Sequence, residues 1–291
     1  RPAEYEQWVK YRIPCADFSQ EKGPLNVCEC VLDAYGNPYI PGSSLKGMIR
    51  TILGAYWAYG SKQRDNWQRE ITRDIGKMQT PNAFLNRQIG DIENDIFHTV
   101  QRMDEKGRLV KKEDAVNDMM SGFIVSDSDP LTTGDLILCQ KVDEDQDGKS
   151  HSINVLRESI RPGGEIHFTL TIDTRICPVT KQDLLDAAAY FSERYYNEHL
   201  SKFKSADRPS EDTVWLGGGS GFHTKTIVNS VFGGKEALVN TCKILSKKKD
   251  PKTRKAKNEN DVEKGVSPHI LKCTEYQGKR YIFGQCKLEI L

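Results

Sequence analysis

The sequence has no surplus of charge of either sign. Its 291 residues include 42 lysines and arginines and 41 aspartates and glutamates, which gives a formal net charge of +1 at pH 7. A protein that attracts nucleic acid with its whole surface carries a clear excess of positive charge. That class of protein is excluded, so any basic surface on this molecule must be local.

Long apolar runs are absent too. No stretch of about 18 apolar residues occurs, so the sequence predicts no transmembrane helix and no membrane partner. No signal-peptide pattern is present either. The chain starts at Arg1 without methionine, and we expect a piece of its N-terminus to be missing.

The eight cysteines lack the spacing of a metal site. None forms a C-x-x-C pair, and Cys28 and Cys30 would share one face of a strand, where disulfide geometry is poor. We therefore expect no metal, no cofactor and eight reduced thiols in a cytoplasmic protein.

Common catalytic patterns are also missing. None of the six histidines lies in an H-E-x-x-H motif, and there is no G-x-S-x-G segment. Asp127 and Asp129 lie in an Asp-Ser-Asp-Pro segment, which more often caps its own backbone than serves as an acid pair. His223 is the histidine to test as a general acid or base.

The helix expected over residues 43–58 begins with features that suit a phosphate. It follows a Pro-Gly turn, opens with two serines of the type that cap helices, and carries two cations four residues apart on its polar face. Free N–H groups and the positive end of the helix dipole favour an anion at this position. The candidate contacts are Gly42, Ser43, Ser44, Lys46 and Arg50.

A glycine-rich segment at residues 217–221 is a second candidate. Glycine backbone can approach a ligand closely, and its N–H groups can line a concavity. The segment is neither a nucleotide P-loop nor a G-x-G-x-x-G motif, and a connection with no ligand is the alternative. The nearby side chains of His223 and Lys225 favour a polyanion as the ligand. The candidate contacts are Gly217, Gly218, Gly219, Ser220, Gly221, His223 and Lys225.

Hydropathy patterns divide the chain into helical and extended parts. Residues 62–120 predict an inserted lobe of two or three helices, broken near residues 80–81 and 106–107. The acidic turn at residues 143–151 is expected to be a hairpin tip, and the basic tract at 247–257 a mobile loop. Strands are expected over residues 27–32, 123–127, 136–139, 166–173, 270–276 and 280–291, and a further helix over 183–200.

Together these motifs resemble the RAMP superfamily of CRISPR RNA-guided complexes. The resemblance rests on the Pro-Gly-Ser-Ser helix start within residues 39–50, on the glycine-rich loop, and on the Arg-Glu-Ser-Ile-Arg-Pro-Gly segment at 157–163. The order of these segments, with Ser-Asp-Ser-Asp-Pro-Leu at 126–131, is most similar to the capping subunit of type III-A Csm complexes. The likeness covers about residues 26–60 and 120–291.

The resemblance implies a fold and a division of the chain. It implies ferredoxin-like, RNA-recognition-type modules, in which a split βαβ sheet carries helices on one face. The residues alone support an α+β class. The expected modules are residues 1–178, which contain the helical insertion, and residues 179–291, which contain the glycine-rich loop.

The resemblance also implies a function. We expect a non-catalytic subunit that binds guide RNA, caps the backbone filament near the 3′ part of the guide and supports its maturation in a prokaryotic cytoplasm. Its partners would be the guide RNA and neighbouring Csm backbone and small subunits, with target RNA as a further candidate. Arg157 and Arg161 join the candidate contacts, and an exposed salt-bridging turn is the alternative for them. Phosphate contacts carry no sequence information, which suits guides of any sequence.

Two alternative functions stay open. The first is a RAMP-type endoribonuclease that processes precursor guide RNA with His223 or His167. Related RNA-cutting subunits carry a catalytic aspartate near the position of Asn26, and an amide cannot replace that carboxylate, although Glu29 and Asp33 are close in sequence. The second is a scaffold that contacts only protein.

Overall fold

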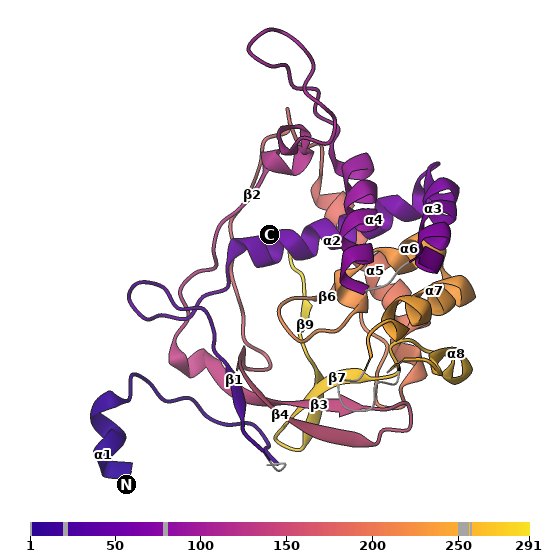
Figure 1. The fold of residues 1–291 in the computed structure, drawn as a ribbon. Coiled ribbons are helices and arrows are strands. Elements are labelled where there is room, and N and C mark those ends of the chain that lie inside the picture. Colours follow the sequence, from indigo (N-terminus) through magenta and orange to yellow (C-terminus); the bar gives the residue numbers. More distant parts are fainter. Residues whose placement is uncertain (1, 20–22, 78–80, 250–255, 257) are drawn as a thin grey trace.

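The computed structural model describes residues 2–19, 23–77, 81–249, 256 and 258–291. A sheet forms one layer and most of the helices form another above it (Figure 1). Residues 250–255 and 257 of the expected basic loop lie outside the described part, as does Thr80 at the expected helix break. None of the described helices is long and apolar enough to cross a membrane.

The main sheet has five strands in the order β1-β4-β3-β7-β8. Its edge strand β1 runs parallel to β4, and the other neighbours are antiparallel. The turn between β3 and β4 is closed by a hydrogen bond from the N–H of Asp145 to the carbonyl of Lys149 (3.0 Å), which confirms the predicted hairpin tip. The strands are β1 (Asn26–Cys28), β3 (Leu136–Glu144), β4 (Ser150–Ile160), β7 (Leu271–Tyr276) and β8 (Lys279–Ile282).

Two short ladders complete the extended structure. β2 (Phe123–Val125) pairs with β5 (Leu170–Ile172), and β6 (Thr213–Trp215) pairs with β9 (Gln285–Lys287). The strand predicted over residues 166–173 is regular only within β5. At Thr169 the backbone N–H donates to the hydroxyl of Ser126 (2.9 Å). Beyond β5 the two segments are joined by isolated backbone bonds, from the N–H of Ser126 to the carbonyl of Thr169 (3.0 Å) and from the N–H of Asp129 to the carbonyl of His167 (3.0 Å).

The closing strand predicted over residues 280–291 is divided into β8 and β9. Gly284 separates them with φ of +78°, and a Cβ there would lie 2.5 Å from the carbonyl oxygen of Leu216. This close approach joins the C-terminal segment to the start of the glycine-rich loop.

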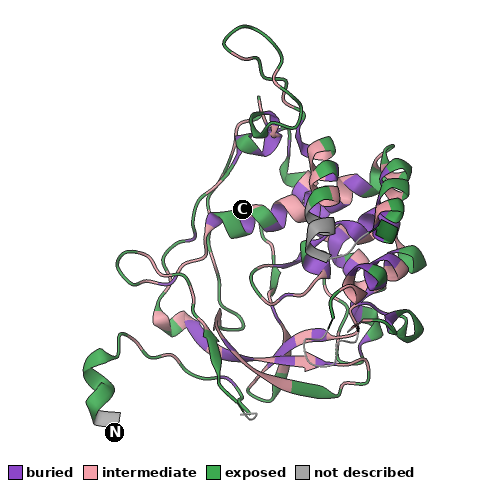
Figure 2. Ribbon diagram, viewed as in Figure 1, coloured by how far each residue is buried: buried purple, intermediate pink, exposed green. Residues whose placement is uncertain are grey.

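Helix α2 (Gly42–Gly60) is the centre of the helical layer. Nine of its residues are buried, and all of these except Gly42 and Gly54 belong to the main hydrophobic cluster (Figure 2). Helices from both halves of the sequence pack into that cluster. The other helices of more than four residues are α3 (Arg64–Lys77), α4 (Pro81–Phe97), α5 (Lys181–Glu198), α6 (Val228–Phe232) and α7 (Gly234–Ser246), and single turns form α1 (Pro2–Tyr5) and α8 (Asp261–Lys264).

The predicted helical lobe is helical only in its first part. α3 and α4 confirm two helices, but residues 98–114 form an extended excursion that protrudes at the top of Figure 1. A bridge between Met103 and Leu109 closes it into a small hairpin, and Gly107 turns the chain with φ of +73°. The predicted break at residues 106–107 is therefore a hairpin turn and does not separate two helices.

Packing continues across the expected module boundary at residues 178/179. The five-stranded sheet combines β1, β3 and β4 with β7 and β8 from the second half. The main cluster likewise joins Trp67 of α3 to Phe191 of α5 and Val231 of α6. The division into two modules stays a prediction about the sequence.

The first turn of α2 is capped from a distance. Pro41 is the N-cap residue and no side chain of the helix start makes a capping bond, so the predicted capping by Ser43 or Ser44 is wrong. Instead, the Asp127 carboxylate accepts the N–H of Gly42 (2.8 Å). A neighbouring hydroxyl, that of Ser128, accepts the N–H of Ile40 (2.9 Å).

We expect Gly42→Ala to destabilise the protein by about 1–3 kcal/mol, because its Cβ would lie 2.2 Å from the backbone oxygen of Ser126. Gly47→Ala in the same helix is the matched control. Nothing lies within 4 Å of a Cβ at Gly47, so this change should stabilise the helix by about 0.5–1 kcal/mol. Urea unfolding measures both. Equal effects of the two substitutions would contradict the close approach.

Candidate functional site

The glycine-rich segment is a loop whose shape only glycine permits. It follows β6 and leads into a 3-10 turn, His223–Lys225. Gly217, Gly219 and Gly221 have φ of +95°, +91° and +103°, a region that L side chains rarely adopt. The hydroxyl of Ser220 is turned inward and donates to the carbonyl of Gly217 (3.1 Å). Ser220 therefore maintains the loop, and we no longer assign it to a ligand.

Arg157 packs directly on this loop. It lies on β4, between β1 and β3. A Cβ on Gly218 would be 2.9 Å from Nη1 of Arg157, and a Cβ on Gly219 would be 3.3 Å from its Nε. The two glycines thus leave room for the guanidinium, and two segments that the sequence analysis proposed separately lie together.

The Arg157 guanidinium lacks an acidic partner among the described residues. Its Nε is buried and has no hydrogen-bond partner there. A half-buried cation that forms no ion pair is unfavourable by itself, because it loses hydration without compensation. An external anion at the loop would supply the missing partner.

Lys225 follows the loop and is exposed. It borders a cavity of about 520 Å³ between the loop and α4. The cavity is lined by Ile89, Gly90, Glu93, Gly221, Phe222, Lys225 and Thr226. The structure therefore places the charged lobe helix α4 beside the glycine-rich loop.

The start of α2 retains only part of its predicted site. Gly42 is buried and its N–H is bonded to Asp127, so it is not available to a phosphate. Ser43 and Ser44 are exposed, and Lys46 is partly exposed. These three residues keep a polar surface that a ligand can reach.

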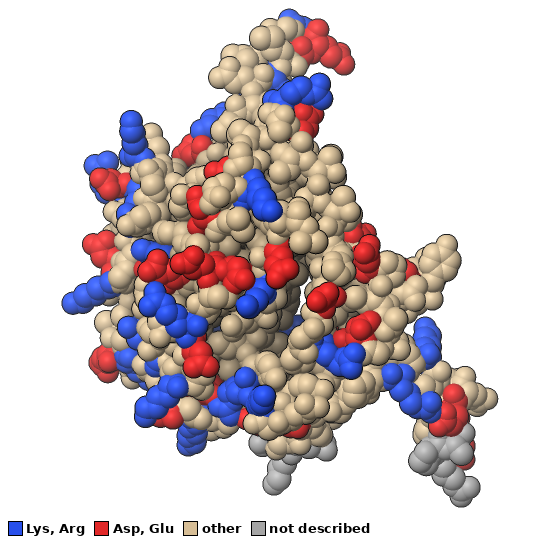
Figure 3. All heavy atoms as spheres, turned by 180° about the vertical axis from the view of Figure 1, so that it is seen from behind, with Lys and Arg blue, Asp and Glu red and all other residues tan. Residues whose placement is uncertain are grey.

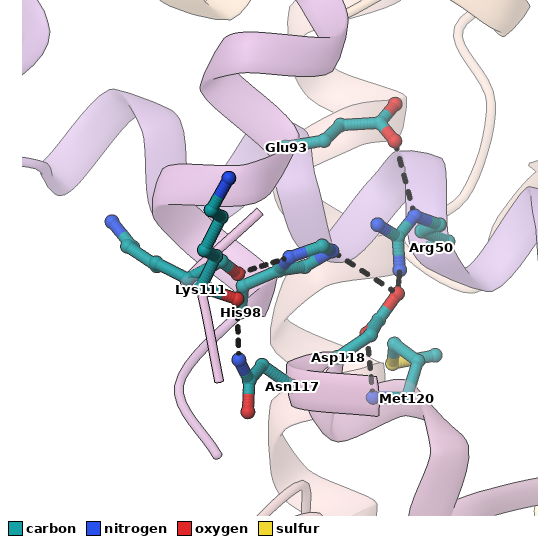
Figure 4. Close-up of polar contacts among 8 residues, drawn as sticks. Arg50, Glu93, His98, Lys111, Asn117, Asp118 and Met120 are labelled. Carbon is teal, nitrogen blue, oxygen red and sulfur yellow. Dashed lines mark hydrogen bonds and ion pairs between the residues drawn. The ribbon is translucent and has the colours of Figure 1, made fainter. Parts of the chain in front are cut away.

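Arg50 belongs to an internal ion-pair network (Figure 4). Its Nε donates to Glu93 (3.1 Å) and its Nη1 to Asp118 (2.7 Å). Its guanidinium also lies 4.1 Å from the centre of the Phe97 ring. Two carboxylates neutralise this cation, so the prediction that Arg50 neutralises an RNA backbone is not supported, and we assign it to the fold.

The same network fixes the segment after the hairpin. Asp118 caps a 3-10 turn by accepting the N–H of Met120 (2.8 Å), and His98 Nε2 lies 3.9 Å from its carboxylate. On the other side of the His98 ring, Nδ1 contacts the carbonyl oxygen of Lys112 (2.7 Å). Figure 4 shows these side chains converging between α2 and α4.

His223 is buried, which argues against its predicted contact with RNA. Its Nε2 donates to the carbonyl of Ser267 (2.8 Å), and Asn229 contacts Nδ1. The ring centre lies 4.4 Å from that of the buried His199. Burial lowers the pKa of His223 to about 4, so the ring is neutral at pH 7 and has no access to solvent as a general acid or base.

The remaining candidates lie on the surface. Arg161 is exposed and lies 3.9 Å from the carboxylate of Asp135, which is the salt-bridging turn that the sequence analysis gave as its alternative. His167 is exposed near Glu165 (3.7 Å). Asp33 accepts the N–H of Asn37 (2.8 Å), and this bond lowers the pKa of its carboxyl group and binds the residue into its own turn.

Charges of both signs are interspersed on the face opposite to that of Figure 1, around a hollow near its centre (Figure 3). This distribution agrees with a net charge of +1. Within the described ranges, no group of three or more His, Cys, Asp or Glu side chains is arranged to hold a metal ion.

Three side chains that shape the site were not predicted from the sequence. Asp127 had been interpreted as capping its own backbone, yet it caps α2. Glu93 and Phe222 line the cavity, and neither had been considered. A helical projection of residues 81–97 marks Glu93 as polar, but only the fold shows that Arg50 and the loop lie beside it.

The chain matches the family model of the RAMP superfamily over residues 12–264. It is 29% identical over 285 residues to the CRISPR system Cms protein Csm5 of Mycobacterium tuberculosis (strain CDC 1551 / Oshkosh), covering 94% of this chain and 69% of that protein. It is 32% identical over 216 residues to the protein of the same name from Streptococcus thermophilus, covering 72% of this chain and 53% of that protein. The chain thus spans about half the length of the streptococcal relative.

The fold is shared with a solved structure. A chain in the cryo-EM structure of a Csm-crRNA-target RNA ternary complex of a type III-A CRISPR-Cas system superposes with a TM-score of 0.52 at 19% identity. The match covers 89% of this chain and 75% of that chain. It confirms the predicted α+β class with a helical insertion.

The buried His223 predicts a loss of stability in acid. Its folded pKa of about 4 is below the unfolded value of 6.5, so the unfolded state binds more protons as pH falls from 6.5 towards 4. We expect this residue to cost about 2 kcal/mol of unfolding free energy between pH 7 and pH 5. Urea unfolding should show a shallower pH dependence for His223→Gln.

His151→Gln is the control for this experiment, because His151 is exposed. This variant should keep the pH dependence of the original protein. An unchanged pH dependence in His223→Gln would show that the His223 ring does not resist protonation in the folded state.

Proposed function

The chain belongs to the RAMP superfamily, and from this membership we propose that it is a non-catalytic, guide-RNA-binding subunit of a type III-A CRISPR effector complex. Its likeness to proteins named Csm5 and its fold support this proposal. Its partners would be crRNA, neighbouring Csm subunits and target RNA. It would cap the backbone filament near the 3′ part of the guide and support guide maturation in the cytoplasm.

One observation carries the proposal, namely the unpaired guanidinium of Arg157 against Gly218 and Gly219. Guanidinium groups form strong bidentate hydrogen bonds with phosphate. Glycine backbone lets a phosphate approach closely, and a loop of alternating conformations can present its N–H groups to an anion. A ribonucleotide backbone would satisfy the guanidinium and the loop together.

Each residue that we propose as a contact is exposed, lies in the glycine-rich loop, or carries a cationic group without an acidic partner among the described residues. These residues would contact the phosphates and sugars of the RNA and not its bases, so they would serve guides of any sequence. They are Ser43, Ser44, Lys46, Arg157, Arg161, Gly217, Gly218, Gly219, Gly221 and Lys225.

We propose that this chain does not cleave RNA. The histidine of the glycine-rich loop is buried and neutral, which argues against general acid–base chemistry there. The resemblance places the catalytic aspartate of related RNA-cutting subunits near Asn26, an amide that lies in β1 opposite Val155 of β4. RNA binding without cleavage is the function that these residues favour.

Arg157→Ala tests the central contact. We expect it to weaken guide-RNA binding about tenfold at low salt and to reduce the slope of log K against log salt concentration by about one, because one phosphate contact is lost. Fluorescence anisotropy with guide-length single-stranded RNA, repeated between 50 and 300 mM salt, measures both values. Unchanged binding would contradict the proposal.

Arg175→Ala is the matched control, because the Arg175 side chain is 88% exposed and paired with Asp173 (2.9 Å). It should leave affinity and salt slope unchanged. Gly218→Ala is an independent variant, since its Cβ would lie 2.9 Å from Nη1 and displace the guanidinium. Thermal unfolding of each variant separates lost binding from lost folding.

Crosslinking distinguishes an RNA-binding subunit from a protein-only scaffold. A photoreactive residue in place of Lys225 should crosslink to guide RNA within the assembled complex, because Lys225 is exposed beside the loop. The same residue in place of the exposed Lys62, just after the C-terminal end of α2, is the control. Crosslinks from both positions to protein alone would favour the scaffold.

A further inference from the structure

We propose that the cavity between α4 and the glycine-rich loop receives one unstacked nucleobase of the bound RNA. This inference rests on the proposed function, because it requires RNA along the loop. It goes further by assigning a base-binding site, where the loop itself would contact only phosphate.

The size and lining of the cavity suit a base. Its volume of about 520 Å³ lies within the range of small-molecule sites and exceeds the volume of a single nucleobase. An aromatic ring, Phe222, lies on its wall, and base–aromatic stacking is independent of sequence. Glu93 and Lys225 add a hydrogen-bond acceptor and a donor to the same wall.

Gly90 keeps the α4 side of the cavity open. It lies inside α4, where glycine lowers helix propensity relative to alanine. Nothing lies within 4 Å of a Cβ built there, so packing does not require glycine. Gly90 does line the cavity. A larger side chain at this position would enter the cavity, so glycine leaves this side of the cavity accessible to a base.

Glu93 is held in place to accept a hydrogen bond. Arg50 donates from Nε to one of its carboxylate oxygens (3.1 Å), and the side chain stays 34% exposed. A fixed carboxylate accepts a hydrogen bond from the exocyclic amino group of adenine, cytosine or guanine, or from the N3–H of uracil, so it can contact any base. The ion pair that removes Arg50 from phosphate contact therefore orients the acceptor of this site.

The loop connects the two sites. Gly221 belongs to the loop that would hold the phosphate, and it also lines the cavity. A nucleotide whose backbone follows the loop thus has its base within reach of Phe222. Lys225 lies on the same rim, where it can contact the phosphate or the base edge.

Gly90→Leu tests this site, because its side chain would fill the cavity while leucine favours the helix. Gly76→Leu in α3 is the matched control, since Gly76 is exposed, has nothing within 4 Å of its Cβ and lies outside the cavity. Binding is measured for the chain within the assembled complex, where the guide has one register, with a series of guide RNAs that each carry one abasic nucleotide. Circular dichroism confirms that both variants are folded.

In the original protein and in Gly76→Leu, we expect the abasic change at one position to weaken binding about tenfold more than at its neighbours, because stacking on Phe222 is lost. In Gly90→Leu that position should behave like its neighbours. This pairwise comparison isolates the contact between the base and the cavity.

Three results would overturn the base site. The first is that no abasic position in the RNA weakens binding to the original protein more than its neighbours do. The second is that the abasic position with the largest effect keeps that effect in Gly90→Leu. The third is that Gly90→Leu abolishes assembly with Csm subunits while its affinity for RNA stays the same. The last result would assign the cavity to a protein side chain. If Arg157→Ala still weakens binding of every RNA, the proposed function survives these results; if RNA does not bind, both proposals fail.

Discussion

The structure depends on the hydrogen bond from the Gly42 N–H to the Asp127 carboxylate. This 2.8 Å bond ties the start of α2 to the segment after β2, and the hydroxyl of Ser128 holds Ile40 just before it. The approach is so close that only glycine fits at residue 42. Because α2 is the helix around which α4, α5 and α6 pack, its starting point sets the position of the helical layer. A carboxylate at a helix N-terminus also interacts favourably with the helix dipole.

The position of α2 in turn organises the candidate site. Arg50 extends from α2 to Glu93 of α4 and to Asp118, so the lobe helix is held beside the glycine-rich loop. The loop meets the sheet through Arg157, and residues far apart in the sequence thus share one surface. Of the cations considered, Arg50 is neutralised within the fold, whereas the Arg157 guanidinium and Lys225 are the ones beside the loop. This difference is the reason that we propose Arg157 and Lys225, and not Arg50, as contacts for a ligand.

Much of the fold was predictable, because it follows local patterns. Apolar residues at helical spacing predicted α2 and α5, and the acidic turn predicted the hairpin between β3 and β4. The predictions failed where a distant segment competed with a local one. Ser43 and Ser44 have the chemistry of caps, but Asp127 supplies the cap. The alternation over residues 166–173 predicted a full strand, but regular pairing is confined to β5, and the hydroxyl of Ser126 takes the N–H of Thr169 just before it.

The sequence alone was enough to predict the glycine-rich loop, the helix after the Pro-Gly turn and the α+β class, because backbone preference and periodicity depend on residues that are adjacent in the sequence. Which polar groups remain available to a ligand depends on the tertiary structure. The sequence predicted His223 and Arg50 as ligand contacts. In the fold, His223 is buried, and Arg50 is paired with two carboxylates. Arg157 gained its importance because β4 brings it under Gly218 and Gly219. Charge pairing and desolvation depend on contacts between residues that are distant in the sequence. A local sequence pattern does not specify those contacts.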